Sequence, residues 1–175
     1  MNLLVNSAGF GLPLAFERND IEDEVQHLRL HVEVPMRLMH AALPGMLERR
    51  SGTILNIASV YAVMPRSTYG GGVKNWQVQF SRWANGSYRS RGVTVTAVCP
   101  GSTHTDFHAR LGLPRGEEGI PDWLWLETPR VVEESLRDAE RGKAVSVPSK
   151  RYRAIWTVSQ LAPSEVMARL AARGR

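Results

Sequence analysis

Two side chains with acid–base chemistry lie close together near the middle of the chain. Tyr69 and Lys74 are five positions apart, separated by Gly-Gly-Gly-Val, and Ser59 precedes the tyrosine by ten positions. A tyrosine with an ordinary pKa of about 10 is a poor base at neutral pH, but a neighbouring ammonium group favours the phenolate. A serine hydroxyl can hydrogen-bond a carbonyl oxygen. The three residues are therefore candidates for acid–base chemistry.

These residues sit in a framework of short apolar runs. Four runs, at 3–6, 53–58, 93–99 and 144–147, are nearly continuously apolar, which is typical of strands buried on both faces. Small or polar residues follow the first three runs, where parallel strands deliver ligand-binding groups. These residues are Asn6-Ser7-Ala8-Gly9, Ser59, and Pro100-Gly101-Ser102-Thr103-His104-Thr105.

Helical patterns alternate with the runs. Apolar residues recur at helical spacing from about 20 to 50, and two more helices are predicted at about 72–90 and 129–141. Thr128 is a candidate N-cap for the last helix, Pro129 its first residue, and Gly142 follows its end. Strands alternating with helices predict an α/β fold with a parallel sheet and right-handed crossovers.

A glycine- and proline-rich segment at about 106–127 follows the third run. It contains Trp123 and Trp125, and loops at this place in an open α/β sheet often cover a substrate. The segment is either such a lid or a packed surface loop. We expect residues 1–148 to form one domain that includes this segment, and residues 149–175 to form a basic helical tail.

Charge is unevenly distributed. The net charge is +5, but residues 141–175 hold eight Lys and Arg against Glu165 alone, so the preceding residues are slightly acidic. No basic groove rich in stacking residues is evident, which excludes nucleic acid as an expected partner. Ser164 could cap a short tail helix that, with Tyr152 and Trp156, lies weakly on an anionic membrane surface; a solvated helix is the alternative.

Cysteine usage and hydropathy indicate a cytoplasmic protein. The single cysteine, Cys99, cannot form an internal disulfide and is expected to be a small buried side chain. The N-terminus lacks the basic and apolar regions of a signal peptide, and no run approaches the roughly 20 apolar residues of a membrane span. We therefore expect a soluble product.

The motifs together resemble those of the short-chain dehydrogenase/reductases. The turn at 6–9 is similar to the family's Asn-Asn-Ala-Gly, and residues 50–59 resemble the strand that leads to its catalytic serine. Pro100-Gly101-x-Thr103-x-Thr105 resembles the turn that holds the nicotinamide, and residues 74–81 resemble the helix after the active-site lysine. The likeness spans residues 2 to about 108.

The resemblance implies a reaction and a set of site residues. It implies hydride transfer between NAD or NADP and a small-molecule carbonyl or alcohol, hydrophobic if the two tryptophans cover it, in a homodimer or homotetramer. Ser59 would orient the substrate, Tyr69 would transfer the proton, Lys74 would also bind the nicotinamide ribose, and His31 would occupy the position of a proton-relay asparagine. No metal is implied. The implied cofactor-binding residues are Asn6, Ala8, Gly9, Tyr69, Lys74, Pro100, Gly101, Thr103 and Thr105.

Three features depart from the family pattern. The family spaces its tyrosine and lysine four apart on one helix face, whereas here the spacing is five, through three glycines that weaken a helix; a bulge or late helix start could absorb the extra residue. Where the family has the relay asparagine this chain has His31, which either carries protons in its place or is a packed structural histidine; Pro35, close behind it, would kink the long helix. The strands that in the family carry Gly-x-x-x-Gly-x-Gly and select NAD or NADP have no counterpart in this sequence.

These departures define the expected fold and leave two functions. The fold is a Rossmann-like, doubly wound parallel sheet that lacks the first β-α-β-α-β cofactor-binding half, with the run at 3–5 as an uncovered apolar edge. The protein is either an NAD(P)-dependent oxidoreductase or a catalytically silent fragment that acts as a dimerisation module.

Overall fold

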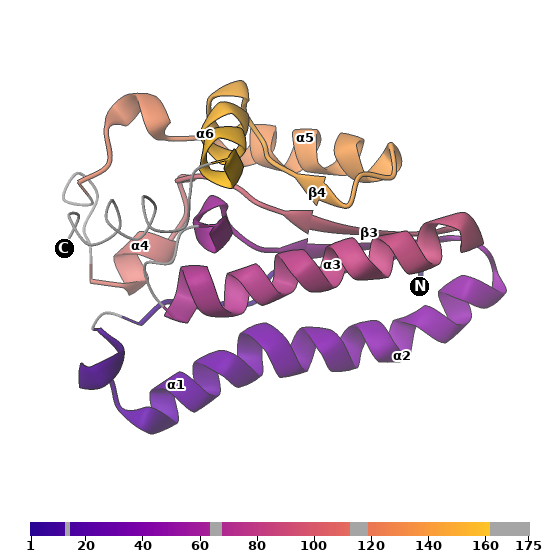
Figure 1. The fold of residues 1–175 in the computed structure, drawn as a ribbon, viewed down its shortest axis with the longest axis horizontal. Helices are drawn as coiled ribbons and strands as arrows, with labels where there is room; N and C mark the ends of the chain where they lie inside the picture. The colour runs from indigo at the N-terminus through magenta and orange to yellow at the C-terminus, as the bar shows by residue number, and fades with distance from the viewer. Residues whose placement is uncertain (13–14, 64–67, 113–118, 162–175) are drawn as a thin grey trace.

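A computed structural model describes residues 1–12, 15–63, 68–112 and 119–161. Four parallel strands form one sheet in the order β1-β2-β3-β4, with helices on both faces (Figure 1). The predicted α/β class with a doubly wound parallel sheet is confirmed. The strands are β1 (Leu3–Asn6), β2 (Gly52–Ile57), β3 (Val93–Val98) and β4 (Val145–Ser146). The helices are α1 (Ile21–Leu28), α2 (Val34–Glu48), α3 (Asn75–Tyr88), α4 (Phe107–Arg110), α5 (Thr128–Glu140) and α6 (Lys150–Leu161).

The strand register brings the carboxyl ends of β1, β2 and β3 together at the same end of the sheet. Asn6 pairs with Asn56, and Ile57 pairs with Val98. The central strands are buried on both faces, as their continuous apolar character predicts. β1 lies at the edge of the sheet, and its Leu3 and Val5 are 46% and 47% exposed.

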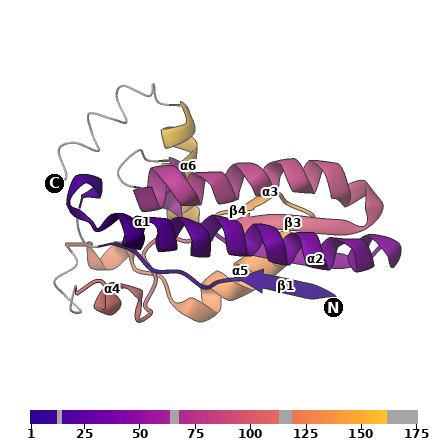
Figure 2. The same ribbon diagram turned by 90° about the horizontal axis from the view of Figure 1, so that it is seen from below.

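One face of the sheet is covered by α3 and by α1 and α2, which follow each other end to end as one long helix that runs beside α3 in both views (Figures 1 and 2). The other face carries α5 and α6. Each face has its own apolar cluster, so the sheet is the middle layer of three. On the α2–α3 side the buried members are Met39, Met46, Ile54, Ala84, Val93 and Val95. On the α5 side they are Leu55, Val98 and Ala139. A third cluster joins Val78 of α3, Ala97 and Cys99 to Val131 of α5 and to Tyr152 and Trp156 of α6.

The helix predicted at 20–50 is interrupted by a π-helix, Arg29–Glu33. The Val34 amide donates to the Arg29 carbonyl five residues back. Pro35 has no amide hydrogen, and in a regular α-helix its ring would collide with the carbonyl of His31. The wider π turn frees that carbonyl, which accepts a 3.0 Å hydrogen bond from Gln77 Nε2 on α3. The expected kink at Pro35 therefore takes the form of a π-helix with a tertiary partner.

The start of α5 differs by one residue from the prediction. Glu127 is the N-cap and makes no side-chain cap, whereas Thr128 is already helical. The Thr128 hydroxyl is drawn away from the cap because it donates to the His104 carbonyl at 2.9 Å. Gly142 follows the end of α5 as predicted, with a left-handed φ of 73°.

The segment predicted as a basic tail begins with α6, which packs onto the domain. Tyr152 and Trp156 are 4% and 8% exposed, so these two side chains are unavailable to a membrane surface. The helix expected around Ser164 lies outside the described residues. Within the described ranges, no helix has the length and hydropathy needed to cross a membrane.

Candidate active site

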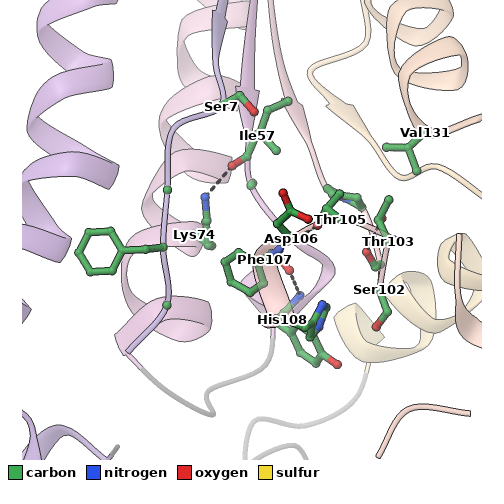
Figure 3. Close-up of a pocket in the computed structure, with 18 of the residues that line it drawn as sticks. Ser7, Ile57, Lys74, Ser102, Thr103, Thr105, Asp106, Phe107, His108 and Val131 are labelled. Carbon is green, nitrogen blue, oxygen red and sulfur yellow. Dashed lines mark hydrogen bonds between the residues drawn. The ribbon is translucent and has the colours of Figure 1, made fainter. Parts of the chain in front are cut away.

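A cavity of about 460 Å³ opens at the carboxyl ends of β1, β2 and β3. This is where parallel α/β sheets bind ligands. Figure 3 shows Lys74 entering from the α3 side, while Ser102, Thr103 and Thr105 occupy the opposite side. The three strand ends predicted to bring small and polar residues together therefore surround one space.

A second π-helix, Thr68–Lys74, carries the tyrosine and the lysine. Residues five apart are stacked neighbours in a π-helix, just as residues four apart are in an α-helix, because the hydrogen bonds run from i to i+5. The extra glycine is thus absorbed, and both Tyr69 and Lys74 line the cavity. Lys74 Nζ lies 5.3 Å from the centre of the Tyr69 ring, over its face.

Burial dominates the electrostatics of this pair. It lowers the pKa of Lys74 to about 7 and raises the pKa of Tyr69 to about 12. The sequence led us to expect that the lysine charge would lower the tyrosine pKa. The pKa shift of Tyr69 has the opposite direction, because burial desolvates its phenol group. Lys74 Nζ instead donates to the Ile57 carbonyl at 2.7 Å (Figure 3).

Ser59 lies at the end of β2, is 8% exposed and lines the cavity. Its Oγ accepts a 3.2 Å hydrogen bond from the Tyr61 amide. The neighbouring Val60 amide donates to the Pro100 carbonyl at 3.0 Å, which ties the loop after β2 to the turn after β3. In that turn the Thr103 hydroxyl donates to the Gly101 carbonyl.

A buried chain of hydrogen bonds fixes the strand ends to the helices. Asn6 Nδ2 donates to Asn56 Oδ1 at 2.8 Å, and Asn56 Nδ2 donates to Ser81 Oγ at 2.9 Å. Ser81 donates to the Gln77 carbonyl, and Gln77 donates to the His31 carbonyl. The chain links β1, β2, α3 and the first π-helix. Sequence reasoning did not assign Gln77, although an amide three residues after Lys74 was a visible signal.

His31 lies behind the cavity wall and does not line it. Its ring is fully buried beside His27 and Tyr69, with ring centres 4.3 and 5.7 Å away. Burial, with the charge of Lys74, lowers the pKa of His31 to about 3, so the imidazole is neutral. A β-carbon on Gly9 would come within 2.6 Å of His31 Nε2, so only glycine fits at that turn.

The structure brings most of the predicted site residues together. Asn6 and Ala8 are the predicted cofactor-binding residues that do not line the cavity, and Asn6 is tied to Asn56 instead. Those that line it are Gly9, Ser59, Tyr69, Lys74, Pro100, Gly101, Thr103 and Thr105. Apolar lining residues that the sequence did not reveal are Phe10, Phe107, Leu111, Val131 and Val132.

Residues 106–112 of the predicted lid lie along the cavity, but its two tryptophans do not. Trp123 is 59% exposed, and Trp125 stacks on His104 with ring centres 4.6 Å apart. The residues just before α5 are fixed to the turn after β3, because the Leu126 amide donates to the Ser102 carbonyl at 2.9 Å. Residues 113–118 lie outside the described ranges.

Tyr152 of α6 binds both the turn after β3 and the residues just before α5. Its hydroxyl accepts a hydrogen bond from the Ser102 amide at 3.1 Å and donates to the Leu124 carbonyl at 3.0 Å. Its ring lies against Gly101, where a β-carbon would come within 2.0 Å of the ring. The C-terminal helix thus positions the Pro-Gly turn.

The sequence profile described as short chain dehydrogenase matches residues 1–115. The chain belongs to this family. The chain spans about half the length of the curated relatives that it matches. A human 3-oxoacyl-[acyl-carrier-protein] reductase is 29% identical to this chain, and the match covers 75% of this chain and 56% of the reductase. An uncharacterized oxidoreductase of Staphylococcus saprophyticus is 31% identical, and that match covers 65% of this chain and 52% of the relative.

Solved structures agree with this assignment. A short-chain dehydrogenase from Sphingobium yanoikuyae in complex with NADPH superposes with a TM-score of 0.80 at 26% identity, covering 96% of this chain and 65% of that one. A 7β-hydroxysteroid dehydrogenase structure superposes with a TM-score of 0.84 at 16% identity, which shows the common fold alone.

Proposed function

We propose that this short-chain dehydrogenase carries the catalytic part of an NAD(P)-dependent oxidoreductase that acts on a carbonyl or alcohol. The observation that supports this most directly is the cavity at the strand ends. It gathers Ser59, Tyr69, Lys74 and the turn at 100–105 despite the altered tyrosine–lysine spacing. Family membership supplies the reaction class.

Each residue has a role that its position supports. The Ser59 hydroxyl is free to donate to a substrate carbonyl, because its oxygen already accepts from the Tyr61 amide. The Tyr69 hydroxyl is protonated at neutral pH and can give its proton to the developing alkoxide of a reduced carbonyl. Lys74 holds the end of β2 through its hydrogen bond to the Ile57 carbonyl and contributes an amine to the same cavity.

The cavity fits the nicotinamide end of a dinucleotide. Its lining includes two glycines, which leave room for a flat ring, and amine and hydroxyl groups that can bind a ribose: Gly9, Gly101, Thr103, Thr105 and Lys74. A bound NADH or NADPH would supply the hydride. The described residues contain no glycine-rich turn of the Gly-x-x-x-Gly-x-Gly type for the pyrophosphate, so the choice between NAD and NADP stays open.

Apolar side chains favour a hydrophobic substrate. Phe10, Phe107, Leu111, Val131 and Val132 line one part of the cavity. An apolar group buried against them gains about 25 cal/mol per Å² removed from water. This replaces the tryptophans as the reason to expect an apolar carbonyl or alcohol.

Cofactor binding tests the proposal. Titration of the chain with NADH, NADPH and reduced nicotinamide mononucleotide, followed by nicotinamide fluorescence, should give saturable binding. Thr103→Val should weaken it, whereas Thr157→Val on the exposed side of α6 should not. Absence of saturable binding by all three compounds would contradict the proposal for this chain.

A silent dimerisation module is the second candidate. The surface formed by Phe16, Ile21, Val25 and Leu28 is apolar and 42–62% exposed, and with Trp76 it borders a groove of about 380 Å³. Such a surface suits a partner helix pair. Ile21→Glu should convert a dimer or tetramer to a monomer in light scattering, while Glu22→Gln on the same helix should not. A wild-type monomer at high concentration would remove this candidate.

The compartment and the remaining partners stay proposals. We propose a cytoplasmic location from the lone buried Cys99 and no nucleic-acid partner from the charge distribution.

A further inference from the structure

We propose that Lys74 is a nucleophilic amine that captures apolar aldehydes as imines inside the cavity, an activity that needs no nicotinamide cofactor. The proposal concerns covalent chemistry at the lysine itself, and is independent of hydride transfer.

The surroundings of Lys74 are those of an amine without a counter-ion. The residue is 4% exposed and lines the cavity at the end of β2. Its Nζ donates to a neutral backbone carbonyl, that of Ile57, and faces an aromatic ring. No ion pair in the described part of the chain includes it. Desolvation favours the neutral form of such an amine, which is the form that attacks carbonyl groups.

The depressed pKa supports this geometry. With a pKa of about 7, roughly half of the Lys74 side chains are neutral at pH 7. An ordinary lysine with a pKa of about 10.4 is neutral in fewer than about one molecule in a thousand at that pH. The lone pair stays available, because the single hydrogen bond at Ile57 uses an N–H of the amine.

The cavity selects the carbonyl compound. Its volume of about 460 Å³ accommodates a small aromatic aldehyde, and Phe10, Phe107 and Leu111 supply apolar contact. Two polar hydroxyls in the wall, those of Ser59 and Tyr69, can hydrogen-bond the carbonyl oxygen. The preferred class is therefore an apolar aldehyde rather than a sugar aldehyde.

The reaction balances without an added oxidant or reductant. The Nζ lone pair forms a bond to the carbonyl carbon while the C=O π bond breaks, which gives a carbinolamine. The carbinolamine loses its oxygen as water, which carries away both hydrogens of the amine, and the C=N bond forms. Reduction by cyanoborohydride then fixes the imine as a stable secondary amine for detection.

The chain contains three lysines, which makes the experiment direct. Lys143 is paired with Asp138 at 2.5 Å, and Lys150 is exposed at the start of α6. We would incubate the folded chain with cinnamaldehyde and sodium cyanoborohydride at about pH 7 and map the adducts by peptide mass spectrometry. Modification of Lys74 should be at least about tenfold faster than that of Lys143 or Lys150, given its larger neutral fraction.

Two controls separate cavity chemistry from general lysine reactivity. Glyceraldehyde should show a much smaller preference for Lys74 than cinnamaldehyde does. Lys74→Met should remove the fast adduct, while Lys150→Met should leave it intact. Because the wild-type chain carries its own comparison lysines, the result stands even if Lys74→Met fails to fold.

The proposal is overturned if Lys74 reacts no faster than the other two lysines in the folded chain, or if its advantage persists in urea. Equal preference for both aldehydes would overturn the assignment of the apolar class.

Discussion

Burial of basic side chains is the dominant effect at the scale of single residues. Lys74, His27 and His31 all lie within the domain, and the pKa of each is lowered by desolvation. A buried base with a lowered pKa binds fewer protons than it does in the unfolded chain. Stability therefore rises with pH over the interval between the folded and unfolded pKa values. These side chains cost stability in acid and tune the chemistry of the site.

His31 offers a test of this linkage. The unfolded chain binds a proton at this residue near pH 6.5, whereas the folded chain keeps it neutral down to about 3. The free energy of unfolding should thus fall by up to about 1.4 kcal/mol per pH unit as pH drops through this window. His31→Phe should flatten the curve, measured by urea denaturation at several pH values. The same replacement at His40, exposed on α2, should leave the slope unchanged; an equal effect at both sites would contradict the assignment.

At the scale of elements, two π-helices adapt irregular sequence to the fold. Arg29–Glu33 accommodates Pro35, and Thr68–Lys74 accommodates the extra glycine. In both cases the widened turn lies beside the cavity or its supporting hydrogen bonds. The π geometry at the second site keeps Tyr69 and Lys74 on one wall.

The glycines of the second π-helix are not equivalent. A β-carbon on Gly70 would lie 2.9 Å from the Tyr61 carbonyl oxygen, whereas one on Gly72 would meet nothing within 4 Å. Gly72→Ala should raise the free energy of unfolding by about 0.5–1 kcal/mol, because alanine loses less backbone entropy in a helix. Gly70→Ala should lower it. Denaturant unfolding of the two variants measures both signs, and equal effects would argue against this local geometry.

Tyr152 links α6 to the Pro-Gly turn through its hydroxyl, so this group should contribute to stability beyond the packing of the ring. Tyr152→Phe keeps the ring against Gly101 but leaves the Ser102 amide and the Leu124 carbonyl without their partner. We expect a loss of about 1–3 kcal/mol in the free energy of unfolding, which comes in addition to the contribution of the packed ring. Amide exchange at Ser102 should also accelerate, which NMR can measure. Thr157→Val on the same helix should change neither quantity.

Much of this arrangement could be predicted from sequence, for stated physical reasons. The buried strands and the residues that follow them were predictable because period and composition reflect local burial. The side chains of Gln77 and Tyr152 were not, because their partners lie 46 and 50 residues away in the chain. The π-helix at 68–74 was foreseeable only as one way to absorb an insertion, since local sequence does not determine which turn widens.

At the scale of the whole molecule, the sheet has an exposed apolar edge. β1 pairs with β2 on one side, and Leu3 and Val5 are about half exposed. The backbone groups on the free side of an edge strand can pair with another strand, and proteins commonly protect such edges with charged side chains. The described residues of β1, Leu3–Asn6, contain no charge.

A charge placed on this edge should therefore reduce self-association. Val5 is 47% exposed, so Val5→Lys should be accommodated with little loss of stability while it opposes strand pairing. Light scattering during incubation at rising concentration should show slower aggregation than in the wild type. Val158→Lys provides the matched control, because Val158 is 67% exposed on α6, away from the edge. If both variants aggregate equally slowly, net charge is responsible; if neither differs from the wild type, the edge of β1 does not drive association.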